Sequence, residues 1–144
     1  MARVTIELPE HFEFSTDLEI RIQHINRGNH LGNDCLVSFL NEARVRYMEE
    51  AINTMRENAI WMINADLAVV YKSEGFYGEI LTVEVQAGDF HKCGFDLFFR
   101  LTNKQSGVEV AHAKMAMLLM DSSTRALVYP EEGVEKFLED YKKN

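Results

Sequence analysis

Apolar and polar residues alternate along several segments of the chain, and this alternation predicts strands. Residues 4–8 and 18–25 show the two-residue period of a strand with one buried face. Turn-forming residues separate further apolar, aromatic or alternating segments, at about 65–72, 80–85, 95–102 and 108–120. We therefore predict an antiparallel sheet of about five or six strands.

A single long helical pattern lies at about residues 35–59. Its apolar residues recur at spacings of three and four, which places them on one face of a helix: Leu36, Leu40, Ala43, Tyr47, Ala51 and Met55. Asn33 or Asp34 is the expected N-cap, because a short side-chain oxygen can accept a free N–H of the first turn. Pro130, followed by two acids, predicts a short final helix to about residue 142.

One long amphipathic helix can cover one face of an antiparallel sheet, so the predicted fold class is α+β. The chain has 144 residues and shows no break in composition, which is typical of one domain over residues 1–144. It carries 23 acidic and 15 basic residues, a net charge of −8. That balance disfavours nucleic acid and anionic membranes as partners, since both attract basic surfaces.

Cofactor and compartment signals are absent from the sequence. Cys35 and Cys93 form no disulfide framework, and the five histidines show no metal-ligand spacing. We therefore expect neither a metal nor another cofactor. The first residues lack the apolar core of a signal peptide, and no apolar run is long enough to span a membrane. A cytoplasmic location is the expectation.

The most specific motif lies between Arg21 and Arg44, in the segment RIQHINRGNHLGNDCLVSFLNEAR. It resembles the signature of hotdog thioesterases of the 4-hydroxybenzoyl-CoA type. In that signature a strand, a carboxylate and a short turn precede Gly/Asn-His-x-x-Asn and a helix carrying Glu-Ala-Arg. His30, Asn33 and residues 42–44 fall on matching positions. The resemblance extends over about residues 16–132 and implies a hotdog fold, a curved sheet wrapped round one long central helix.

The chain departs from this signature at the position of the usual catalytic Asp, four residues before the His. Asn26 occupies that position, and His24 occupies the often acidic position two residues earlier. An amide does not titrate, so Asn26 can orient a water or hydrogen-bond a carbonyl but cannot act as a general base. The resemblance therefore implies the architecture of the family without its usual nucleophile or base.

Thioester hydrolysis needs an activated water, a stabilised oxyanion and a pocket for the acyl group. The N-terminus of a buried helix offers free N–H groups to the carbonyl oxygen. The resemblance implies that the thioester is held at this point. The residues expected to contact substrate are Leu31, Gly32, Asn33, Tyr71 and Lys92, the lysine through phosphates of CoA.

Four side chains are candidates for catalysis, namely Asn26, His30, His24 and Glu42. His30 can polarise the carbonyl or act as a base, or it can tie the turn as a structural residue. His24 faces the site if it shares a strand face with Asn26, and is otherwise a surface residue. Glu42 is either the missing base within the helix, as in other hotdog subfamilies, or a partner of Arg46.

These observations favour a thioesterase that hydrolyses acyl-CoA, or an acyl thioester of acyl carrier protein, to the free acid. The alternative is a non-hydrolytic protein that binds acyl thioesters and has lost the catalytic Asp. The family implies a site shared between subunits, so we expect a homodimer or a tetramer of dimers.

Overall fold

The computed structural model describes residues 3–142. Within them lie five strands, two α-helices and one short 3-10 helix. In chain order they are β1 (Phe14–Glu19), η1 (Ile22–His24), α1 (Asn33–Glu57), β2 (Ile60–Tyr71), β3 (Ile80–Gly88), β4 (Gly94–Asn103), β5 (Glu109–Asp121) and α2 (Val134–Lys142).

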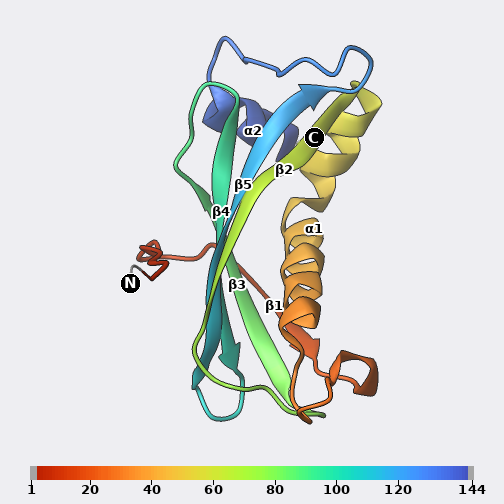
Figure 1. The fold of residues 1–144 in the computed structure, drawn as a ribbon. Coiled ribbons are helices and arrows are strands. Elements are labelled where there is room, and N and C mark those ends of the chain that lie inside the picture. Colours follow the sequence, from red (N-terminus) through yellow and green to blue (C-terminus); the bar gives the residue numbers. More distant parts are fainter. Residues whose placement is uncertain (1–2, 143–144) are drawn as a thin grey trace.

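The strands form one antiparallel sheet in the order β1-β3-β4-β5-β2. Figure 1 shows that the sheet is strongly twisted and that α1 runs along one of its faces. The shorter α2 contacts α1 near the end of the sheet where α1 ends. The predicted α+β class, with a curved sheet round one long helix, is confirmed.

The core lies between the sheet and α1. Alternate side chains of β3, β4 and β5 are buried on the face toward α1, because successive strand residues point to opposite faces. The matching stripe of α1 consists of Leu36, Phe39, Leu40, Ala43, Met48, Ala51 and Met55. The helix bends at Met48, whose φ of −111° and ψ of 16° lie outside helical values.

Both expected strands of the N-terminal region differ from the structure. Residues 4–8 form no strand, because an isolated alternating segment needs a partner and Pro9 removes a donor. The expected strand at 18–25 is placed too late, since β1 ends at Glu19 and the chain then turns through η1. The expectation that His24 shares a strand face with Asn26 is therefore wrong.

Two further boundaries differ. The strand expected from residue 65 begins earlier, at Ile60, and includes a register shift between Asn64 and Asp66. The helix expected from Pro130 begins at Val134. Residues 131–132 form a turn instead, and Gly133 follows with a φ of 89° that favours glycine.

Candidate active site

A cavity of about 380 Å³ lies where the N-terminus of α1 meets the chain that follows β2. Five residues expected from the sequence line it: Asn26, His30, Leu31, Asn33 and Tyr71. The remaining lining residues are Leu36, Lys72, Ser73, Glu74, Gly75 and Val110. The cavity therefore combines an apolar wall with a polar mouth, as small-molecule sites commonly do.

Asn26 holds the turn that carries His30. Its Oδ1 accepts hydrogen bonds from the N–H of Gly28 at 2.9 Å and from the N–H of His30 at 3.4 Å. Its own N–H donates to the carbonyl of His30 at 2.9 Å. Asn29 adopts a φ of 66°, a left-handed conformation that asparagine tolerates. The Nδ2 of Asn26 donates to no residue within 3–142, so it can serve a bound water or carbonyl.

The imidazole of His30 is oriented by its own backbone neighbour. Its Nδ1 lies 3.2 Å from the carbonyl oxygen of Leu31. A carbonyl oxygen only accepts, so Nδ1 carries the proton in this contact and Nε2 is left to accept. Nε2 lies 3.7 Å from Oε1 of Glu74, a residue that the sequence did not mark as a candidate.

Gly32, and not Asn33 or Asp34, is the N-cap of α1. Its carbonyl accepts the N–H of Leu36 at 3.1 Å, and a Cβ on it would lie 2.6 Å from Oδ1 of Asp34. Asn33 Oδ1 accepts the N–H of Asp34 at 3.0 Å. The N–H groups of Asn33 and Cys35 donate to no other described residue, and the first turn of a helix normally leaves such donors free. The N-terminus of α1 thus offers open donors beside the cavity.

Tyr71 links the end of β2 to the first turn of α1. Its hydroxyl donates to the carbonyl of Asn33 at 3.0 Å. Partial burial raises the pKa of Tyr71 above its ordinary value, and the negative charge of Asp34 adds to the effect. The hydroxyl therefore stays protonated near neutral pH and acts there as a donor.

Glu42 and His24 line a second cavity, of about 510 Å³, and not the first one. Glu42 accepts a hydrogen bond from Nε of Arg46 at 2.9 Å, the i,i+4 contact that was the alternative to a catalytic role. The Nδ1 of His24 accepts the N–H of Arg21 at 2.9 Å, and its ring meets that of Phe39 edge-on. His24 is therefore packed against α1, and Glu42 is paired with Arg46 of the same helix.

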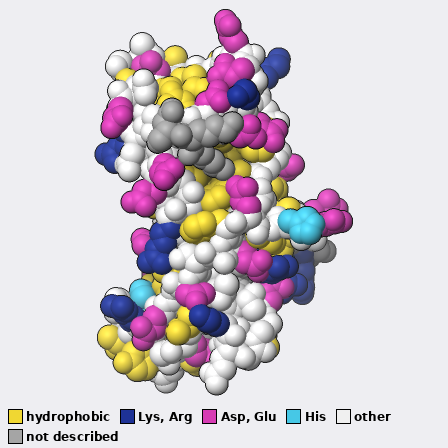
Figure 2. Space-filling model, turned by 180° about the vertical axis from the view of Figure 1, so that it is seen from behind, with side chains coloured by type: hydrophobic (Ala, Val, Ile, Leu, Met, Phe, Trp, Pro, Cys, Tyr) yellow, Lys and Arg dark blue, Asp and Glu magenta, His cyan; other side chains and the backbone are white. Residues whose placement is uncertain are grey.

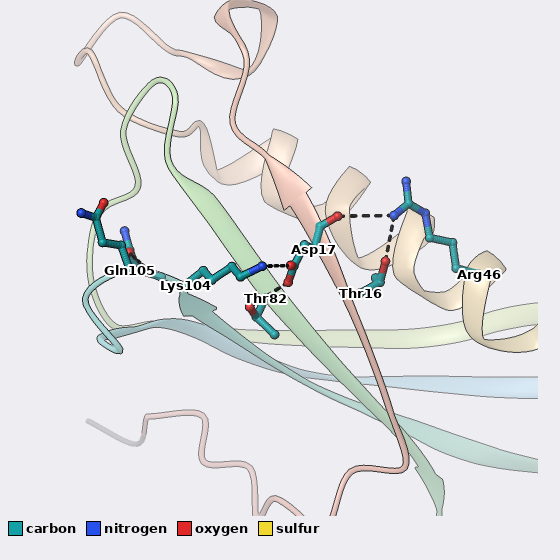
Figure 3. Close-up of polar contacts among 7 residues, drawn as sticks. Thr16, Asp17, Arg46, Thr82, Lys104 and Gln105 are labelled. Carbon is teal, nitrogen blue, oxygen red and sulfur yellow. Dashed lines mark hydrogen bonds and ion pairs between the residues drawn. The ribbon is translucent and has the colours of Figure 1, made fainter.

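Figure 3 shows the polar contacts that join β1 to α1 and to the rest of the sheet. Arg46 also donates to Oγ1 of Thr16 at 2.8 Å and so joins α1 to β1. On the other side, the carboxylate of Asp17 accepts from Lys104 at 2.5 Å and from Thr82 at 2.9 Å. The hydrogen bond from Lys104, followed by that from Thr82, lowers the pKa of Asp17. These contacts fix the position of β1, from which the chain continues into the turn that carries His30.

Lys92 lies far from the first cavity within one chain. It is exposed in the β3–β4 loop, which Figure 1 shows at the opposite end of the sheet. Along β5, Gly94 pairs with Leu118, whereas Tyr71 pairs with Ala111, a separation of 118 − 111 = 7 residues. At about 3.3 Å per strand residue this is roughly 20 Å. One chain does not bring Lys92 to the other predicted substrate contacts.

Over residues 3–142, no three His, Cys, Asp or Glu side chains are grouped to hold a metal ion. The helices in that range are too short or too polar to cross a membrane. Figure 2 shows acidic and basic side chains interspersed over one side of the molecule, without a continuous basic stripe among the described side chains.

The family follows from comparison with known proteins. Residues 20–138 match the family model of the thioesterase-like superfamily. The chain belongs to this superfamily. The resemblance to hotdog thioesterases that the His30 motif indicated is therefore confirmed. A search of curated protein sequences finds no match.

Solved structures support the same fold. The probable thioesterase YbaW from Escherichia coli has a TM-score of 0.78 at 21% identity, over 92% of this chain and 97% of that one. SAV2348 from Staphylococcus aureus, solved in complex with CoA, has a TM-score of 0.78 at 19% identity, over 97% and 89%. The DHNA-CoA thioesterase from Staphylococcus aureus has a TM-score of 0.77 at 17% identity, over 90% and 88%. At these identities the likeness shows the hotdog fold of the chain.

Proposed function

We propose that this protein is an acyl-CoA thioesterase whose active site is the cavity between the N-terminus of α1 and the chain after β2. One observation carries this proposal. The imidazole of His30, the amide of Asn26 and the first turn of α1 all border the same partly apolar cavity. A base, a polar anchor and open backbone donors are the groups that thioester hydrolysis requires.

The proposed reaction uses these groups in sequence. Water attacks the thioester carbon while Nε2 of His30 takes one of its protons. The oxygen of the tetrahedral intermediate is stabilised by the open N–H groups of Asn33 and Cys35. The C–S bond then breaks, the imidazolium returns its proton to the departing thiolate, and the products are a carboxylic acid and free CoA. Asn26 keeps the turn in place and donates through Nδ2.

His30 is proposed as the base because of where the other candidates lie. His24 and Glu42 border the second cavity and are engaged by Arg21 and Arg46. A general base must reach the proton that it removes, either directly or through one water. Of the three titratable candidates from the sequence, His30 is the one that lines the cavity at the start of α1.

We also propose that two copies of the chain pair along β2. This strand is an edge of the sheet, and its exposed side chains include Trp61, Leu67 and Tyr71. A long apolar edge strand is a ready template for pairing with a second strand. Tyr71 also lines the cavity, so a partner on this edge would border the active site. Light scattering in solution should give at least twice the chain mass, and a monomer would contradict the pairing.

A non-hydrolytic acyl-thioester binding protein is the second candidate. Asn26 favours it, because this position lacks the carboxylate found in the family signature. Such a protein would keep the cavity and bind substrate without releasing thiol.

Release of free thiol separates the two candidates. Short, long and aromatic acyl-CoAs, and an acyl thioester of acyl carrier protein, are incubated with the protein and a thiol-reactive dye. The thioesterase proposal predicts enzyme-dependent release from at least one substrate. Calorimetric binding of acyl-CoA without release from any substrate would overturn it and support the binding protein.

A further inference from the structure

Glu74 reaches the active-site cavity from the segment between β2 and β3. This segment is anchored on both sides of Glu74. Before it, the hydroxyl of Ser73 donates to the carbonyl of Glu109 at 2.7 Å. After it, the carbonyl of Gly75 accepts the N–H of Leu31 at 2.7 Å. Residue 74 is therefore held beside residue 30 by the backbone of its neighbours.

Gly75 makes this close approach possible. It is buried, and a Cβ on it would lie 2.7 Å from Cδ1 of Ile20 and 3.5 Å from Cβ of Leu31. A side chain at position 75 would therefore require the Ile20 side chain to shift. Gly75 is thus packed against Ile20 and Leu31, and its backbone keeps Glu74 next to the turn that carries His30.

The contact between Glu74 and His30 has the geometry of a water site. Oε1 of Glu74 and Nε2 of His30 lie 3.7 Å apart, beyond direct hydrogen-bond length. Because Nδ1 of His30 donates to the carbonyl of Leu31, Nε2 carries no proton. Nε2 and Oε1 of Glu74 are therefore both acceptors. A water molecule has two O–H donors and can lie about 2.8 Å from both atoms at once.

We propose that Glu74 is a positioning residue that orients the attacking water and supplies the negative charge that Asn26 lacks. This inference rests on the proposed function. In the water-attack step, one water proton passes to Nε2 of His30 while the other stays hydrogen-bonded to Glu74. The water oxygen forms the new bond to the thioester carbon. The carboxylate then faces a cationic imidazolium, which it stabilises until the proton leaves with the thiolate.

Other charged groups lie around the same cavity. Lys72 lines it from the end of β2, and Asp34 lies in the first turn of α1. Glu74 differs from both because its Oε1 lies 3.7 Å from Nε2 of His30. Among the described residues, no other carboxylate lies as close to a ring nitrogen of His30.

Glu74→Gln tests the inference, because glutamine keeps the size of the side chain and removes its charge. Glu57→Gln is the matched control, since Glu57 is an exposed residue at the far end of α1. With the best acyl-CoA of the panel, we expect Glu74→Gln to lower kcat by about tenfold or more, because a charge close to the imidazolium is removed. KM should change by less than about twofold, and the melting temperature should stay that of the wild type. Glu57→Gln should keep the wild-type kcat.

A double variant distinguishes action through His30 from a structural effect. If Glu74 acts through His30, Glu74→Gln should cost little further activity in a His30→Ala background. Unchanged kcat in Glu74→Gln, a change in KM alone, or full additivity of the two substitutions would each overturn the role of Glu74. Each of these results leaves the proposed thioesterase function standing. If the wild type releases thiol from no substrate, the proposed function falls, and the role of Glu74 falls with it.

Discussion

Substitution of Asn26 by Asp and by Ala separates the turn-holding role of this residue from its chemistry. Oδ1 of Asn26 accepts the N–H groups of Gly28 and His30. Aspartate keeps an oxygen in that place and exchanges the free amide nitrogen for a second oxygen. Alanine removes both acceptors and releases the turn. The two variants therefore differ in whether the loop stays in place.

The stability effect can be estimated from the two contacts. One is short, at 2.9 Å, and the other is long, at 3.4 Å. A net contribution of about 0.5–1.5 kcal/mol per hydrogen bond, with the long one at the low end, predicts that Asn26→Ala loses about 1–2 kcal/mol. For a chain of this size that is a fall in melting temperature of about 3–6 °C. Asn26→Asp should stay within about 0.5 kcal/mol of the wild type.

The two variants of Asn26 should also differ in kcat. Asn26→Asp keeps His30 in place and exchanges the Nδ2 donor for a carboxylate that can act as a general base. Because general base catalysis contributes more than one neutral hydrogen bond, kcat should be at least that of the wild type. Asn26→Ala should lose about tenfold or more in kcat, because the base is no longer held in reach of the water. Thermal unfolding by circular dichroism and thiol release measure the two effects. Wild-type stability and wild-type kcat in Asn26→Ala would refute the reasoning.

Three further predictions test other parts of the structure. Gly94→Ala should lower the free energy of unfolding by about 3 kcal/mol or more in urea titration, because the new Cβ would clash with the backbone of β5; wild-type stability would contradict that close approach. Asp17→Asn should cost at most about 1 kcal/mol at pH 7, since the pair with Lys104 is exposed. In the folded wild type the pKa of Asp17 is lowered from 3.8, so the loss of unfolding free energy in Asp17→Asn should shrink as pH falls below that value. A loss that grows in acid would refute the lowered pKa. Glu42→Ala should keep kcat within about threefold of the wild type, whereas a loss of a hundredfold would make Glu42 the base.

Long periodic segments of this fold are predictable from the sequence. The helix expected at about 35–59 is observed at Asn33–Glu57, because its apolar stripe faces the core along its whole length. The alternation of apolar and polar residues predicts β3, β4 and β5, which are found within a few residues of the expected bounds. The strand predicted at 4–8 is wrong, because a strand forms only where it pairs with a neighbouring strand, and the local pattern does not record that pairing.

The candidate site is predictable only in part. The family resemblance led to Asn26 and His30 through the motif and to Tyr71 through the later strands, and the structure places all three at one cavity. Glu74 was not predicted, because the segment Lys-Ser-Glu-Gly is typical of an exposed turn. The hydrogen bond from Leu31 to Gly75, which the sequence does not show, brings Glu74 to His30. The strand placement expected for His24 is wrong, because the 3-10 turn of η1 ends the alternation on which that placement depended.

The most direct test compares two histidines that lie six positions apart on the same segment. Thiol release from the best acyl-CoA is measured for the wild type, His30→Ala and His24→Ala, with melting temperatures recorded for each. The account predicts that His30→Ala loses about a hundredfold or more in kcat and that His24→Ala stays within about threefold. A hundredfold loss in His24→Ala with wild-type kcat in His30→Ala would place the chemistry at the second cavity and contradict the account.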